Sequence, residues 1–240
     1  MKKSILFTLI IYFLIQFNTL VFADDFMELL SKATNAYKSG NYAAALMYYD
    51  KIVEQYPDNA GAHAILGTLY LEQYEDYPRA IESFSNAIKY DSSQAAHYSY
   101  RGIARMKAGD IDGAINDLTK TIAINNQNKT PDAFAYCTRA LLYSMNSKYE
   151  LAIKDATEAI KLQPKYPEAF HYRGLSKMSL ALKTLSMQTM DSGIQDLNYA
   201  KEQCLQKYDM TEYQNVLESY KKALTAKNVL ERELNKSKGK

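Results

Sequence analysis

The sequence predicts an all-α protein built as a solenoid of paired helices, and three observations support this. Its 240 residues are 47% apolar and 12% aromatic, which is enough to bury a sizeable core. Only 9 Gly and 5 Pro are present, which leaves little material for the many tight turns of a β-sandwich. Apolar residues recur at helical spacing with a period of about 34 residues, and helical units of that length stack into solenoids.

The first 23 residues have the pattern of a secretory signal peptide. Lys2 and Lys3 precede the apolar run Ile5–Ile15, and the segment ends in Val21-Phe22-Ala23. A charged start, a short apolar middle and a small-x-Ala end predict cleavage after Ala23 and a periplasmic or secreted protein. The mature form would then have no membrane span. Apolar character continues to the end of this segment, so an uncleaved membrane anchor is the alternative.

The charge balance argues against a nucleic-acid partner. The chain has 29 basic and 27 acidic residues, and removal of Lys2 and Lys3 with the leader would leave 27 of each. A protein that tracks phosphates needs a basic patch or stripe. We therefore expect no nucleic-acid binding and interpret residues 236–240 as a solvated basic tail.

Residues 24–207 divide into five repeats, each with two helical stretches separated by a polar break. The second stretches carry a small residue, then usually a large one four positions later, as in Ala80 and Phe84. Small residues let the two helices of a pair approach closely, and neighbouring pairs must stack to cover their apolar faces. The expected repeats are 26–59, 60–94, 95–128, 133–166 and 167–207.

Local signals define several boundaries. Gly40-Asn41 and Gly109-Asp110 each place a capping residue after Gly, which predicts a turn followed by a new helix. Repeat five has about seven extra residues, close to two helical turns, so we expect two long helices with a projecting tip near Leu185–Asp191. An amphipathic helix over 208–235 is expected to cap the last repeat, with a free coiled-coil arm as the alternative.

The second repeat carries Leu66-Gly67-x2-Tyr70 on its first stretch, followed by Ala80 and Phe84 on its second. In this motif and in its period the chain resembles the tetratricopeptide-repeat family. The resemblance implies a right-handed solenoid whose first helices line a concave face that binds peptides or proteins. The closing proline of the family pattern is replaced by Ser92 in this repeat.

The places that this resemblance turns inward are apolar, aromatic or hydroxyl-bearing and nearly uncharged. Such a lining suits a partner with aromatic or aliphatic anchors. Family members that bind a carboxylate use Lys, Asn and Arg at positions that hold other residues here. This carboxylate-binding set is therefore absent. Those places hold Leu30, Thr34, Ile65, Ala96 and Tyr100. The predicted groove residues are Leu30, Thr34, Tyr37, Thr68, Leu71, Tyr100, Ile103, Met106, Leu141, Met145, Tyr172 and Leu175.

Arg and Asp recur together in repeats three to five, with the arginines on the first helices and the aspartates on the second. Repeats one and two lack both partners. Joint presence and joint absence predict a structural ion pair inside each repeat rather than a row of ligand-binding arginines. The predicted pairs are Arg101–Asp117, Arg139–Asp155 and Arg173–Asp196.

The sequence offers little for catalysis. His63, His97 and His171 fall in different repeats without metal-ligand spacing, and no phosphate loop or nucleophile motif occurs. Cys137 and Cys204 are expected to be buried thiols, although export would permit a disulfide. We therefore expect a non-catalytic scaffold for a peptide or protein, without metal or cofactor. The alternatives are a carrier of a small apolar ligand and a groove filled by the C-terminal helix.

Overall fold

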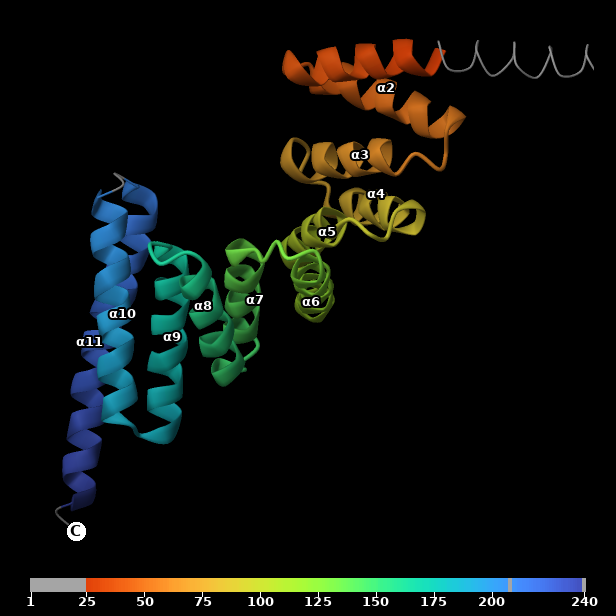
Figure 1. Cartoon of the computed structure of the whole chain (residues 1–240). Coiled ribbons are helices and arrows are strands. Elements are labelled where there is room, and N and C mark those ends of the chain that lie inside the picture. Colours follow the sequence, from red (N-terminus) through yellow and green to blue (C-terminus); the bar gives the residue numbers. More distant parts are fainter. Residues whose placement is uncertain (1–24, 207–208, 239–240) are drawn as a thin grey trace, which may run out of the picture. The chain divides into compact units, whose positions relative to one another are not determined.

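A computed structural model of the chain describes residues 25–206 and 209–238, and every regular element in these two ranges is an α-helix. The helices form two compact units, one ending at Tyr100 and the other starting at Arg101 (Figure 1). The predicted leader, with its cleavage site after Ala23, lies outside the described residues. Within the described part, no helix has an apolar stretch long enough to cross a bilayer.

The first unit is built from successive helices, and the first three share a core cluster. Its core buries small and large apolar residues together, among them Ala45, Ile52 and Leu69, all at 0% exposure. Its elements are a helix over residues 25–38, α2 (Tyr42–Gln55), α3 (Ala60–Glu72), α4 (Tyr77–Tyr90) and the first half of α5 (Ala95–Lys107).

Two of the turns between paired helices use a glycine in the left-handed region, at Gly40 (φ +75°) and Gly109 (φ +86°). The residue after each glycine then caps the next helix. Asn41 accepts a hydrogen bond from the Ala44 backbone N–H, and Asp110 accepts one from the Gly113 N–H. These bonds satisfy backbone donors that the first turn of a helix leaves without partners. The two predicted turns are therefore confirmed.

Close helix contact in the first unit depends on Gly67 of α3 and Phe84 of α4. A Cβ atom at Gly67 would lie 2.9 Å from three atoms of the Phe84 ring. Phe84 is fully buried, and its ring also stacks on that of Tyr100 at a centroid distance of 5.6 Å. The small-residue pattern of the sequence thus places a large ring where two helix backbones approach each other.

The second unit ends in three long helices. Helices α9 and α10 have 18 and 20 residues, against 13 for α7 and 14 for α8, so the expected lengthening of repeat five is present. The chain turns between them at Leu185, whose φ is +53°. The elements are α6 (Ile111–Gln127), α7 (Ala133–Met145), α8 (Tyr149–Leu162), α9 (Pro167–Thr184), α10 (Met187–Gln206) and α11 (Met210–Lys238).

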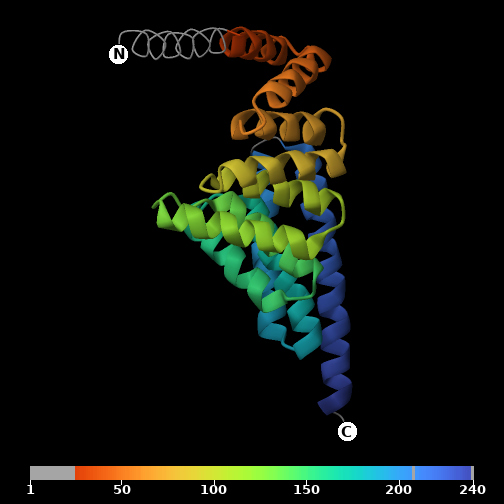
Figure 2. The same cartoon turned by 90° about the vertical axis from the view of Figure 1, so that its right-hand side faces the viewer.

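Helix α11 packs against α10 and α9 of the same chain, as a cap of the last repeat would (Figure 2). It buries Val216, Ala223 and Leu230. The helix continues three residues past the expected end at 235, so Lys236 is helical rather than part of a tail. Lys236 donates to Glu233 at 2.8 Å, an i,i+3 pair that favours this last turn.

Candidate functional site

The first unit contains a cavity of about 440 Å³ between the helix of residues 25–38 and α3. It brings together four of the predicted groove residues, Leu30, Thr34, Tyr37 and Thr68. The complete lining is Leu30, Thr34, Tyr37, Lys38, Tyr49, Ile65 and Thr68.

Helical spacing explains why these side chains meet. Leu30, Thr34 and Tyr37 follow one another at intervals of four and three residues, which places them on one face of their helix. Ile65 and Thr68 are three residues apart on α3 and line the same cavity. The walls are therefore mainly aliphatic and aromatic, with a few hydroxyl groups among them.

The polar side-chain groups that line the cavity are the ammonium of Lys38 and the hydroxyls of two threonines and two tyrosines. Burial and the nearby Glu72 carboxylate raise the pKa of Tyr37 above its usual value, which is itself well above neutral pH, so its hydroxyl is protonated there. The Tyr37 ring packs edge-on against Tyr42, at a centroid distance of 5.8 Å, and this contact orients it. Thr68 donates its hydroxyl to the Ala64 carbonyl at 3.0 Å. Lys38 supplies the charge at this site.

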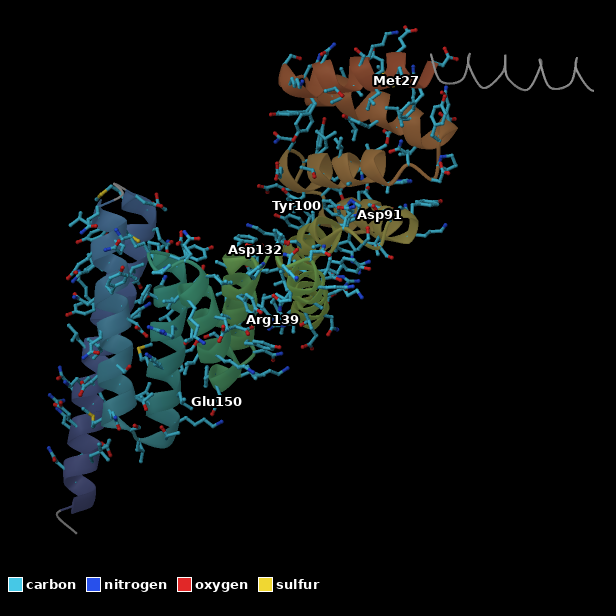
Figure 3. All side chains as sticks on the ribbon, in the orientation of Figure 1. Met27, Asp91, Tyr100, Asp132, Arg139 and Glu150 are labelled. Carbon is cyan, nitrogen blue, oxygen red and sulfur yellow. The ribbon has the colours of Figure 1, made fainter. Side chains whose placement is uncertain are left out.

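The two remaining groove candidates of the first unit lie in different environments. Leu71 is buried in the core at 8% exposure, so it does not present a surface to a ligand. Tyr100, which Figure 3 labels, is 39% exposed. Its ring lies flat against that of Phe84, with an interplanar angle of 10°. Tyr100 therefore has a partly exposed ring whose orientation is fixed by stacking on Phe84.

The groove candidates of the second unit are divided among several environments. Met106 packs on the core cluster of Ala114 and Leu118. Tyr172 packs on a cluster that contains Cys137, and burial raises its pKa. Met145 is the most exposed, at 59%. Ile103, Leu141 and Leu175 are half-buried.

Tyr172, one of the predicted groove residues, is half-buried. Its ring lies beside the buried residues Cys137, Ala159 and Ala169, from α7, α8 and α9. Removing the ring would disturb this packing as well as any ligand contact.

All three Arg–Asp sets face each other within the second unit. In each one, the guanidinium Nε and Nη2 donate to the two oxygens of one carboxylate. The shorter bond of each pair is 2.7 Å for Arg101–Asp117, 2.6 Å for Arg139–Asp155 and 2.7 Å for Arg173–Asp196. The aspartate side chains are only 4–8% exposed. The arginines are therefore engaged inside the repeats (Figure 3 labels Arg139).

Two further cations join these pairs, and the sequence analysis missed them. Arg105 donates to Asp117 at 2.9 Å and Lys177 donates to Asp196 at 2.7 Å. Each lies four residues after the arginine of its repeat, one helical turn further along the same face. That spacing was a usable signal. In repeat four the same place holds Tyr143, whose ring lies 5.6 Å from the Arg139 guanidinium carbon.

The histidines are engaged in two different ways. His63 and His97 contact the backbone carbonyls of Pro57 and Asp91, each six residues earlier, at 2.9 and 3.2 Å. His171 instead contacts side chains of α11. Within residues 25–206 and 209–238, no three His, Cys, Asp or Glu side chains gather as metal ligands would.

Comparison with known proteins finds matches to one protein family. A family model described as "Tetratricopeptide repeat" matches residues 30–84 and 73–129. A TPR repeat-containing protein of Methanocaldococcus jannaschii is 26% identical over 153 residues, covering 64% of this chain and 25% of that protein. Hsc70-interacting protein 1 of Drosophila melanogaster is 32% identical over 106 residues, covering 44% of this chain and 28% of that protein. The chain thus spans about a quarter of the length of these curated relatives.

The fold is also similar to solved structures. A crystal structure of MamA protein superposes with a TM-score of 0.66 at 22% sequence identity, covering 77% of this chain and 94% of that one. The similarity supports the arrangement of stacked helix pairs, a TPR-like solenoid.

Proposed function

Since the chain belongs to the tetratricopeptide-repeat family, we propose that it is a non-catalytic scaffold that binds a peptide or protein segment through its first unit. The observation that carries this proposal is the 440 Å³ cavity, in which predicted groove residues from two helices converge. The arginines and aspartates that a catalytic hypothesis would need are already paired with one another inside the second unit.

The residues that line the cavity indicate which side chains a bound peptide segment would carry. Aliphatic and aromatic walls favour one or two large apolar side chains, because most of the affinity of an interface comes from a few such anchors. The Tyr37 hydroxyl lines the cavity and can donate a hydrogen bond to a backbone carbonyl of the segment. The name of one relative, Hsc70-interacting protein 1, states that it interacts with a protein, and this supports the same class of function.

A carrier of a small apolar molecule is the second candidate. The cavity volume lies within the range of about 300–1,000 Å³ that small-molecule sites occupy. Native mass spectrometry of the purified chain distinguishes the two functions. A co-purifying small molecule, lost when Thr34 is replaced by Phe, would support the carrier.

We further propose that the protein acts outside the cytoplasm, after cleavage following Ala23. The support is the charged start, apolar run and Val21-Phe22-Ala23 end of the leader. Mass spectrometry of the N-terminal peptide tests this. A mature chain that starts at Asp24 is expected, whereas retention of Met1–Ala23 would favour the anchor.

Crosslinking from inside the cavity tests the scaffold function. A photo-crosslinking amino acid placed at Ile65 is expected to capture members of a peptide library rich in aromatic and aliphatic residues. The control places it at Met47, which is 45% exposed and does not line the cavity. Equal capture of the same peptides from both positions would contradict binding in the cavity.

A further inference from the structure

A second cavity, of about 300 Å³, lies in the second unit among residues of α8, α9 and α10. Four of its five lining side chains are polar, whereas the cavity of the first unit is mainly apolar. None of the five is among the groove residues predicted from the sequence. The lining is Ile153, Lys177, Gln188, Thr189 and Ser192.

Lys177 brings a positive charge to this cavity from a nearly buried position. Its side chain is 17% exposed, and its ammonium donates to Ser192 at 2.8 Å and to Asp196 at 2.7 Å. An ammonium has three N–H donors, so these two contacts leave one donor for a ligand. Asp196 is also the carboxylate that pairs with Arg173. In the described part of this repeat, two cations therefore share one carboxylate.

Repeat three has the same arrangement with one more carboxylate. Arg101 and Arg105 share Asp117, and Arg105 also lies 3.5 Å from Asp110. Two cations there face two carboxylates. Asp110 lies seven residues before Asp117, which is about two helical turns. This spacing shows which residue of repeat five corresponds to it.

Thr189 occupies the corresponding place in repeat five, seven residues before Asp196. Its hydroxyl carries no negative charge and lies 2.9 Å from Oγ of Ser186 at the start of α10. Asp191, the acid two residues later, is paired with Lys227 of α11 at 2.8 Å. Among the described residues, repeat five therefore lacks the second carboxylate, at a place that lines the cavity.

We propose that this cavity binds the carboxylate of a small ligand, which takes the place that Asp110 has in repeat three. Lys177 supplies the opposite charge, and a charge-assisted hydrogen bond to a nearly buried ammonium is a strong contact. The neighbouring hydroxyls and the Gln188 amide are further hydrogen-bonding groups. Ile153 is the apolar wall for a short carbon chain.

The site is small and separate from the one proposed for the first unit. A volume of about 300 Å³ is at the lower end of the range for small-molecule sites, which suits a ligand of a few carbons. Its carboxylate belongs to a free organic acid or to an acidic side chain of another protein. The proposal does not rest on peptide binding in the first unit, because the two cavities share no residue.

Amide NMR spectra of the isotope-labelled full chain measure the binding. Butyrate is titrated at constant ionic strength, and butyramide, its uncharged isostere, is the control ligand. We expect butyrate to shift the Thr189 and Ser192 amide signals in a saturable way, and butyramide to leave them unchanged. Equal shifts from both compounds would overturn the proposal, because the negative charge would then play no part.

A parallel titration identifies the source of the carboxylate. The probe is glutamate with both backbone groups capped, so that its side-chain carboxylate is the charged group. Tighter binding of butyrate would support a free organic acid, and tighter binding of the capped glutamate would support an acidic side chain. Saturable shifts from neither probe would overturn the site.

One variant removes the charge of the site. Lys177→Gln leaves Asp196 paired with Arg173, and we expect the dissociation constant of butyrate to rise at least about tenfold, the loss of one charge-assisted hydrogen bond. Lys183→Gln is the matched control, because Lys183 is exposed on the same helix and does not line the cavity. Unchanged affinity in Lys177→Gln, or an equal loss in both variants, would contradict the proposal.

A second variant supplies the carboxylate from the chain itself. Thr189→Asp is expected to abolish butyrate binding and to raise the midpoint of thermal unfolding without ligand. An acid in the first turn of a helix is stabilising by itself, so the same substitution is also made in Lys177→Gln, where the rise should be smaller. An equal rise in both backgrounds, or undiminished butyrate binding in Thr189→Asp, would overturn the proposal.

Discussion

Arg139 and Asp155 form a two-point ion pair between α7 and α8. The guanidinium Nε lies 2.6 Å from Oδ2, and Nη2 lies 2.9 Å from Oδ1. The remaining nitrogen, Nη1, donates to the Thr119 hydroxyl at 3.0 Å, which ties α7 to the second helix of the preceding repeat. The arginine side chain is 14% exposed and the aspartate 6%, so one side chain links two repeats from a nearly buried position.

Removing one partner of this ion pair should lower the free energy of unfolding more than replacing both partners. Asp155→Ala leaves a nearly buried guanidinium without its carboxylate, and we expect a loss of about 3–5 kcal/mol in the free energy of unfolding. The double variant Arg139→Met with Asp155→Leu should be the more stable of the two. Urea unfolding followed by circular dichroism measures both. If the double variant is less stable than Asp155→Ala, the unpaired arginine is not what destabilises that variant, and this explanation is contradicted.

The contact between Gly67 and Phe84 predicts a steric cost. Gly67→Ala places a Cβ atom 2.9 Å from three ring atoms, and we expect a destabilisation of about 1–3 kcal/mol from overpacking. Phe84→Leu in the same chain should partly relieve the clash. A double-mutant cycle measures that coupling.

Gly61→Ala is the matched control, because it lies on the same helix. The nearest atom to its added Cβ is Oδ1 of Asn59, at 3.4 Å. Alanine also favours helix over glycine by up to about 1 kcal/mol, so stability should be unchanged or slightly raised. Equal losses in Gly61→Ala and Gly67→Ala would contradict the steric explanation.

Cys137 should be inert in the native chain. Burial raises the pKa of its thiol to about 12, so the nucleophilic thiolate is scarce at pH 8. Iodoacetamide at that pH should modify Cys137 only after unfolding, as measured by peptide mass spectrometry. Rapid native alkylation would place the thiol in a more open environment than the cluster with Ala159 and Ala169.

Much of the fold could be predicted from local sequence signals. The turns at Gly40 and Gly109, their caps and the long fifth repeat each depend on residues close together in the chain. The Arg–Asp pairs could be predicted because repetition shows which residues occur together. Helix α11 was expected over 208–235 from its amphipathic spacing, and it runs over Met210–Lys238.

The site was harder to predict, because exposure depends on neighbours distant in sequence. Register alone placed Leu71 and Tyr172 on the inward face, but packing buries the first and half-buries the second. The contact of His171 with Glu212 joins residues 41 positions apart, without a repeat to indicate it. Leu30 and Thr34 were among the predicted groove residues, and they line the cavity from one helix face.

Peptide affinity for a plugged cavity tests the proposed binding function most directly. Thr34→Phe fills the space between two helices, whereas Asn35→Phe adds the same ring to the exposed neighbouring position. A peptide selected on the wild-type chain is titrated by calorimetry into both variants, with helix content checked by circular dichroism. We expect Thr34→Phe to weaken binding by about thirtyfold or more, the loss of one strong anchor, and Asn35→Phe to leave it unchanged. Unchanged affinity for Thr34→Phe would contradict binding in the cavity.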